Sequence, residues 1–159
     1  EEYNGTSFSE VNNMSQARFG MNSGMGGGTQ TAAIAVGGFV SNPPLVISDK
    51  SEEYDGTNWS SGGDLLTPTQ KPGMGGTQTA LMVAGSELPS VTSFCQTYDG
   101  SSFATAPSMG NVQAGGASAG SSTSMWHAVG GDGTANLSIN QEFTGESTAA
   151  RAVKTVDFD

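Results

Sequence analysis

The chain has 159 residues, a formal net charge of −10 and only five lysine and arginine residues. Because nucleic-acid binding requires clustered basic side chains that neutralise phosphates, this composition argues against a nucleic-acid partner. No apolar run reaches the roughly 18 residues of a membrane-spanning helix, so membrane insertion is not expected either.

The most prominent pattern is an aromatic phrase that recurs along the chain. Its anchors are Tyr3, Tyr54, Tyr98 and Phe143, which are separated by 51, 44 and 45 residues. A period of this size is typical of repeat architectures. Each tyrosine is followed by Asn-Gly or Asp-Gly, dipeptides that favour tight hairpin turns. The phrase therefore predicts two antiparallel strands, one with the tyrosine and the next with a tryptophan or phenylalanine.

A second recurring phrase predicts a buried strand in each unit. Residues 28–38 match residues 76–86 closely and residues 120–131 more loosely. Each is a short apolar run that ends in small residues, which is typical of an inner strand buried on both faces. A further short strand near residues 18–21 completes four strands per unit. Glycine runs such as residues 24–28 are interpreted as tight turns between strands.

In chain order, residues 1–15 hold only the outer half of a unit. Residues 16–66 and 67–110 form two complete units, and residues 111–159 form a terminal unit whose last strand, 152–158, diverges from the repeat. Because β-propellers usually carry about 4–8 blades, three full units predict an incomplete ring in this chain. The missing strands are expected from upstream residues or from other chains; otherwise the units stack as an open array.

The order of these features resembles the Kelch repeat. The doublet Gly37-Gly38, the pair Tyr54-Asp55 and Trp59 carry the resemblance in the best copy, and Gly130-Gly131 with Phe143 carry it in the last. The resemblance implies an all-β fold of Kelch-like β-propeller blades, each of them a four-stranded antiparallel sheet.

A narrower resemblance concerns the alternation of the phrase at residues 52–59 with the phrase at residues 28–33. It is similar to Kelch-like repeat proteins of marine bacteriophages and environmental viruses, which are virion or tail-associated. This implies a non-enzymatic virion structural or host-contact module, such as a tail fibre, a spike or a capsid decoration. The implied location is the virion or the extracellular space. The implied partners are other virion proteins and a host surface receptor, with the chain acting in an oligomer or in a longer chain.

Residues that could carry chemistry are few. His127 is the single histidine and falls within an apolar strand, in the register of Ile34 and Met82, so a core position is favoured over a catalytic base. Without a second histidine, no histidine-rich metal site is expected. Cys95 follows Phe94 in an apolar patch and is interpreted as a small buried hydrophobic residue. We therefore expect no catalytic residue, no metal and no cofactor.

The longest loop of the repeat, residues 39–51, is a candidate contact surface. Two prolines stiffen it, and insertions in repeat proteins gather on one rim that is often the binding rim. The loop at Leu88 is a second candidate. The candidate ligand-contact residues are Phe39, Asn42, Leu45 and Leu88. These loops leave open an alternative function, a secreted carbohydrate- or protein-binding β-propeller adhesin.

Overall fold

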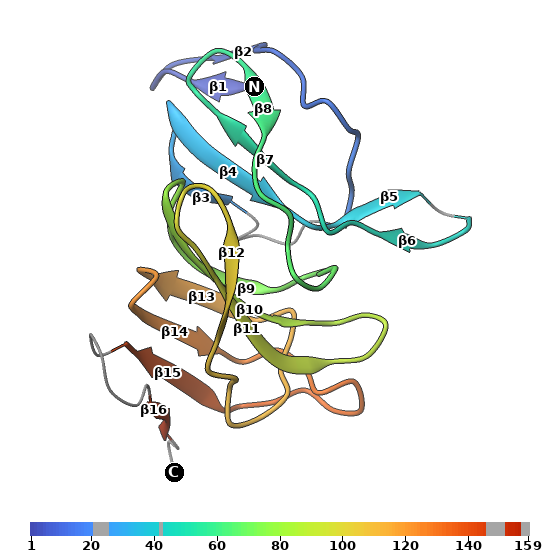
Figure 1. The fold of residues 1–159 in the computed structure, drawn as a ribbon, viewed down its shortest axis with the longest axis vertical. Helices are drawn as coiled ribbons and strands as arrows, with labels where there is room; N and C mark the ends of the chain where they lie inside the picture. Colours follow the sequence, from blue (N-terminus) through green and yellow to red (C-terminus); the bar gives the residue numbers. More distant parts are fainter. Residues whose placement is uncertain (21–25, 42, 146–151, 157–159) are drawn as a thin grey trace.

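The computed structural model describes residues 1–20, 26–41, 43–145 and 152–156, and within them the chain forms strands and no helix (Figure 1). Three four-stranded antiparallel sheets follow one another along the chain. The strands of the first sheet are β3 (Gly26–Thr29), β4 (Ala32–Val36), β7 (Ser51–Tyr54) and β8 (Trp59–Ser61). The strands of the second are β9 (Gly73–Thr77), β10 (Ala80–Ser86), β11 (Thr92–Tyr98) and β12 (Phe103–Ala106). The strands of the third are β13 (Ala117–Gly120), β14 (Ser124–Ala128), β15 (Asn140–Thr144) and β16 (Ala152–Val156).

Two small hairpins complete the described structure. They are formed by β1 (Glu2–Tyr3) with β2 (Phe8–Ser9), and by β5 (Phe39–Ser41) with β6 (Val46–Ile47). The all-β expectation is confirmed, and no sheet closes on itself. Among the described residues, no helix is long and apolar enough to cross a membrane.

The fourth strand of each sheet is not the one that the sequence predicts. Of residues 18–21, Phe19 forms only an isolated bridge with Phe39, and Met21 lies outside the described residues. The glycine-rich strands β3 and β9 take the place at the sheet edge instead, so residues 26–28 are strand and not turn. The apolar strands β4 and β10 are consequently second in their sheets, between a glycine-rich strand and a tyrosine strand.

Glycine suits these edge strands because neighbouring sheets approach closely there. Strand β9 packs against both β3 and β13. A Cβ atom on Gly27 would lie 2.7 Å from Cδ1 of Leu81, and one on Gly73 would overlap Nδ1 of His127. A Cβ atom on Gly75 would lie 3.2 Å from the backbone carbonyl of Gly120, and close approach of one backbone to another is a known reason for glycine inside a strand.

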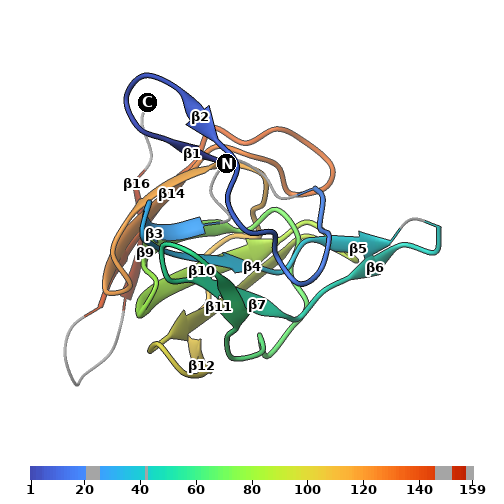
Figure 2. The ribbon, with the colours of Figure 1, turned by 90° about the horizontal axis from the view of Figure 1, so that it is seen from above.

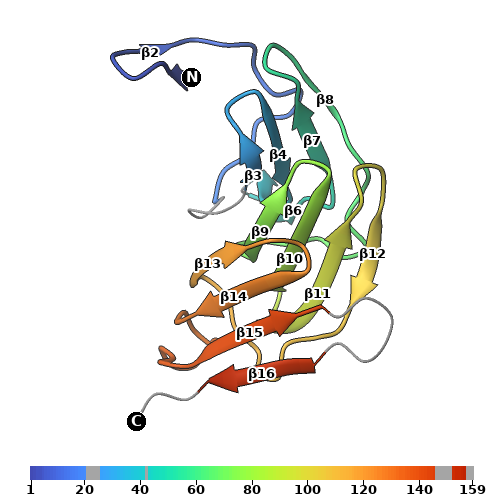
Figure 3. The same cartoon turned by 90° about the vertical axis from the view of Figure 1, so that its left-hand side faces the viewer.

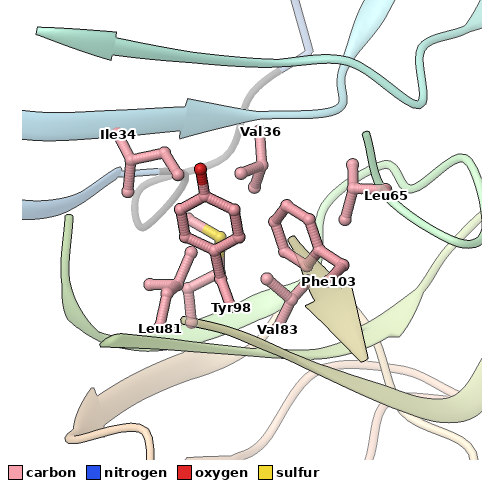
Figure 4. Packing of buried hydrophobic residues seen from close by; sticks show 8 residues of the cluster. Ile34, Val36, Leu65, Leu81, Val83, Tyr98 and Phe103 are labelled. Carbon is pink, nitrogen blue, oxygen red and sulfur yellow. The ribbon is translucent and has the colours of Figure 1, made fainter. Parts of the chain in front are cut away.

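The core lies between the sheets, and strand β10 contributes to both of its halves. Leu81 and Val83 face the first sheet, where Figure 4 shows them with Ile34, Val36 and the ring of Tyr98. The alternate residues Met82 and Ala84 face the third sheet and join a second cluster with Met125 and Phe143. All four β10 residues are fully buried, which confirms the predicted burial on both faces of this strand.

The aromatic hairpins form as the sequence predicts. The ring centroids of Tyr54 and Trp59 are 5.1 Å apart, those of Tyr98 and Phe103 are 4.6 Å apart, and those of Tyr3 and Phe8 are 4.9 Å apart. The side chain of Asp55 accepts hydrogen bonds from the backbone N–H groups of the turn, as does that of Asp99. Both aspartate side chains thus stabilise the hairpin turns that follow them.

The units lie in a row that follows the sequence. In Figure 3 the β1–β2 hairpin is at one end, the first and second sheets follow, and the third sheet is at the other end. The hairpin pairs only β1 with β2. Strand β16 pairs with β15 and supplies the fourth strand of the third sheet, within the predicted range 152–158, of which residues 157–158 lie outside the described residues. The exact unit boundaries stay a prediction.

Candidate contact rim and groove

The loops between the second and third strands of the three sheets emerge on the same side of the molecule. They comprise residues 37–50, 87–91 and 129–139, and we call them the loop rim. They share a side because the second strands β4, β10 and β14 run in the same direction in equivalent sheets. The three loops lie at the right in Figure 1. The first loop contains the β5–β6 hairpin, which extends beyond the sheets when seen from above (Figure 2).

Buried polar side chains hold the bases of two of these loops. The guanidinium of Arg18 donates to the carbonyl oxygens of Gly37 at 3.0 Å and Lys50 at 2.7 Å, one on each side of the first loop. The amide of Gln113 donates in the same way to the carbonyl oxygens of Val129 and Ile139 on either side of the third loop. These contacts fix where each loop leaves its sheet.

Each of these two side chains also meets a buried partner on the third strand of its sheet. Arg18 forms an ion pair with Glu52 at 3.0 Å, with side chains only 1% and 2% exposed. The amides of Gln113 and Gln141 are 2.7 Å apart at the matching place in the third unit. Burial raises the pKa of Glu52, but hydrogen bonds from the amide of Ser15 and from Arg18 outweigh burial and hold that pKa below its ordinary value.

A groove of about 720 Å³ opens on the loop rim between the second and third sheets. Four glycines line it together with apolar side chains and one ion pair, in which Nζ of Lys71 lies 2.5 Å from Oε2 of Glu87. Its lining includes Lys71, Glu87, Val129, Ala135 and Leu137. The groove can therefore accept a ligand with both an apolar face and polar groups.

Two residues that line this groove have a left-handed backbone conformation. Lys71 has a φ of 50° and Val129 a φ of 54°, and they are the non-glycine residues with positive φ in the described chain. A β-branched residue is rarely found in this region, and such strain costs roughly 1–3 kcal/mol. Strained residues of this kind cluster at functional sites, which makes the groove the best candidate site on the molecule.

The equivalent positions in the other units are glycines. Strand pairing aligns Val129 with Gly37 and Gly85, which have φ values of 62° and 73°. The repeat pattern in the sequence predicted that the small-residue doublet of the last unit is residues 130 and 131. The strand pairing instead aligns residues 129 and 130 with the doublets of the other units. Lys71 lies two residues before the first strand of the second sheet. The residue two before the first strand of the third sheet is Gly115, which has a φ of 72°.

Replacing Val129 with glycine is expected to raise the free energy of unfolding by about 1 kcal/mol, because release of the strain exceeds the entropic cost of glycine. Urea denaturation monitored by tryptophan fluorescence measures the change. Val112→Gly is the matched control, since Val112 is also exposed but has no positive φ. A stability loss in Val129→Gly as large as that in the control would show that position 129 carries no strain.

The four contact residues predicted from the sequence lie in different environments. Phe39 is buried and packs on Phe19 with ring centroids 5.3 Å apart, so it is part of the loop base and not of a contact surface. Leu45 is exposed near the tip of the β5–β6 hairpin, whereas Leu88 is half-buried. Asn42 lies outside the described residues. None of the three described residues lines the groove.

Sequence reasoning missed the groove residues, although one signal for them was present. Ala128 aligns with Val36 and Ala84 at the ends of the second strands, so the next residue, Val129, stands where the other units have glycine. An alignment of the units by the ends of their apolar strands, and not by the Gly130-Gly131 pair, would have identified Val129. The Lys71–Glu87 pair joins two segments that only the sheet brings together.

The remaining candidate residues are buried. His127 is in the core as predicted, but in the register of Val83; Trp126 takes the register of Ile34 and Met82. Burial lowers the pKa of His127 to about 4, and its Nδ1 lies 2.6 Å from Oγ of Ser118. Cys95 is 3% exposed, which confirms its interpretation as a buried residue, and burial raises the pKa of its thiol to about 11. The described residues contain no cluster of three or more histidine, cysteine, aspartate or glutamate side chains that could hold a metal ion.

Comparison with known proteins gives a likeness of fold. No family model matches the chain, and no curated protein matches it. Among solved structures, the structure of YjhT is similar to that of this chain, with a TM-score of 0.70 and 12% sequence identity. The likeness covers 90% of this chain and 46% of YjhT, so the chain spans about half the length of that protein. At this identity the likeness shows the fold alone.

Proposed function

We propose that the chain is a non-enzymatic contact module built of Kelch-like β-propeller blades that form an incomplete ring. The propeller assignment is supported by the three four-stranded antiparallel sheets and by the packing of their first strands, β3 on β9 and β9 on β13. We propose further that the module is a structural or host-contact part of a virion. This part of the proposal is supported by the resemblance of the repeated phrases to those of phage proteins.

The groove on the loop rim is the observation that carries the contact function. Its left-handed Lys71 and Val129 stand where other units have glycine, and Val129 remains 47% exposed. Its lining offers apolar side chains, an ion pair and backbone amides, which suits recognition of a surface sugar or a peptide. The chemically active groups His127 and Cys95 are instead buried away from solvent.

The same groove favours the alternative, a secreted carbohydrate- or protein-binding module. Both functions predict a ligand on the loop rim, and they differ in where the protein acts. Virus particles that lack this protein are expected to assemble or adsorb abnormally under the first proposal. Normal assembly together with normal adsorption would contradict it, and would leave the free binding module.

Binding at the groove can be tested with a blocking variant and a matched control. Ala135→Lys places a long charged side chain in the groove from an exposed position, whereas Thr57→Lys makes the same change at an exposed turn on the opposite edge. Glycan arrays and host-cell binding are expected to show at least about a tenfold loss for Ala135→Lys, equivalent to roughly 1.4 kcal/mol, and no loss for Thr57→Lys. Equal binding by both variants would contradict a ligand in the groove.

A further inference from the structure

A tyrosine–glutamate hydrogen bond recurs between neighbouring units. The hydroxyl of Tyr54 donates to Oε1 of Glu2 at 2.9 Å, and the hydroxyl of Tyr98 donates to Oε1 of Glu53 at 2.6 Å. Each glutamate directly precedes the tyrosine position of its own unit. At these two junctions, the earlier unit therefore offers a carboxylate to the tyrosine of the unit that follows it.

The junction between the second and third sheets uses a different pair of residues. The third unit has Phe143, which carries no hydroxyl, in the tyrosine position. The second unit has Thr97 in the glutamate position. At this junction both the donor, a tyrosine hydroxyl, and the acceptor, a glutamate carboxylate, are replaced. This is expected if a glutamate occurs at a junction only where a tyrosine hydroxyl can donate to it.

The third unit nevertheless has a glutamate, Glu142, in the equivalent position on its outer face. Glu142 lies opposite Trp126 in the register of β14 and β15, as Glu53 lies opposite Ile34 in the first sheet. Ile34 and its counterpart Met82 are fully buried by the following unit, whereas Trp126 is 45% exposed. The outer face of the third sheet thus has the residues of a unit junction, and no following unit covers it within the part of the chain that the structure describes.

The β1–β2 hairpin presents the other half of such a junction. Its Tyr3 and Phe8 rings stack like the buried aromatic pairs of the later units, yet they are 51% and 68% exposed. No hydrogen bond to the Tyr3 hydroxyl is found within the described residues. Glu2 of the same hairpin is already engaged by Tyr54 on the inner side. The two incomplete faces lie at opposite ends of the row of sheets (Figure 3).

We propose that a second copy of this chain docks its β1–β2 hairpin on the outer face of the third sheet. The hydroxyl of Tyr3 then donates to Glu142 of the other copy, and the Tyr3 and Phe8 rings cover Trp126. This repeats the geometry of the internal junctions, in which an apolar residue of the second strand lies beneath the aromatic residue of the next unit, as Ile34 lies beside Tyr98 (Figure 4). Such a head-to-tail contact generates closed rings or filaments.

The proposed contact lies on sheet faces and not on the loop rim. Its second copy supplies only the outer hairpin of a unit, so it needs no strand beyond the described ones. Because the groove residues take no part in it, loss of self-association would leave groove binding unaffected, and loss of groove binding would leave self-association unaffected. The two proposals can therefore fail separately.

Sedimentation velocity of the 159-residue chain from micromolar to millimolar concentration tests the proposal. We expect reversible assembly that Trp126→Ser abolishes. Tyr3→Phe and Glu142→Gln are each expected to weaken the association constant about tenfold, because each removes a charge-assisted hydrogen bond. Val112→Ser, an exposed valine between the second and third sheets, is expected to assemble like the unaltered chain.

A double variant separates the specific contact from general stickiness. Tyr3→Phe with Glu142→Thr recreates the natural Thr97–Phe143 junction, and we expect it to associate more strongly than either single replacement at those positions. A chain that stays monomeric at every concentration would overturn the proposal. Assembly that is indifferent to Trp126, Tyr3 and Glu142 would overturn it as well.

Discussion

Replacement of Arg18 with glutamine is expected to lower the free energy of unfolding by about 3 kcal/mol, because it leaves the buried carboxylate of Glu52 without its cation. For a chain of this length, such a loss corresponds to a fall in Tm of roughly 10 °C. Glu52→Gln is expected to cost a similar amount, since the buried guanidinium then lacks its anion. Urea denaturation and thermal melts followed by circular dichroism measure both variants.

The third unit supplies the matched control for this experiment. Gln113 and Gln141 occupy the same two places with neutral amides that hydrogen bond at 2.7 Å. The double variant Arg18→Gln with Glu52→Gln copies this arrangement, so we expect its stability to lie within about 1 kcal/mol of the unaltered chain. If the double variant loses the sum of the two single losses, the ion pair is not replaceable by the amide pair.

The same pair predicts how stability depends on pH. The folded-state pKa of Glu52 is below its ordinary value of 4.5, so the folded chain binds this proton less readily than the unfolded chain. The stabilisation from Glu52 is therefore complete above pH 4.5 and is lost as pH falls through the lower folded-state pKa. Denaturation midpoints below pH 4.5 are expected to fall more steeply for the unaltered chain than for the double variant. Parallel curves would contradict this assignment.

Local signals in the sequence were sufficient to predict the aromatic hairpins. Asp55 and Gly56 define a turn through contacts within four residues, because the aspartate side chain accepts the backbone N–H groups that follow it. The spacing of Tyr54 and Trp59 then fixes which residues face each other across the strands. Burial of β10 on both faces was also predictable, since an apolar run flanked by glycine has few other solutions. The same prediction was wrong for the third such strand, β14, on which Trp126 is 45% exposed.

The features that were missed depend on contacts between units. Gly27 and Gly73 lie in strands although glycine disfavours strands, because a neighbouring sheet approaches closely at both positions. Arg18 meets Glu52 across 34 residues of sequence, and nothing local in either segment indicates the partner. The groove is missed for the same reason, since Lys71 and Val129 approach one another only after the second and third sheets pack.

Replacement of Gly73 with alanine is the second change for which we expect a large loss, about 3 kcal/mol in the free energy of unfolding. Its Cβ atom would overlap both members of the hydrogen-bonded pair formed by His127 and Ser118 on the third sheet. Gly27→Ala is the matched control, because the nearest atom to its Cβ is the end of the flexible Leu81 side chain, at 2.7 Å. We expect at most about 1 kcal/mol there, since Leu81 can change rotamer. Equal losses in the two variants would show that the spacing of the second and third sheets is not set by Gly73.

A compensating change locates the cause of the Gly73→Ala loss. Val83 occupies the register of His127 in the second sheet, so valine is already compatible with this position in the repeat. His127→Val removes the ring that the new Cβ atom would overlap, together with the buried Nε2, which has no hydrogen-bond partner among the described residues. The variant Gly73→Ala with His127→Val is therefore expected to regain about half of the stability lost by Gly73→Ala alone, since a neutral aliphatic side chain restores the space. If no stability returns, the loss arises within strand β9 itself, and the close approach of the sheets is not what selects glycine there.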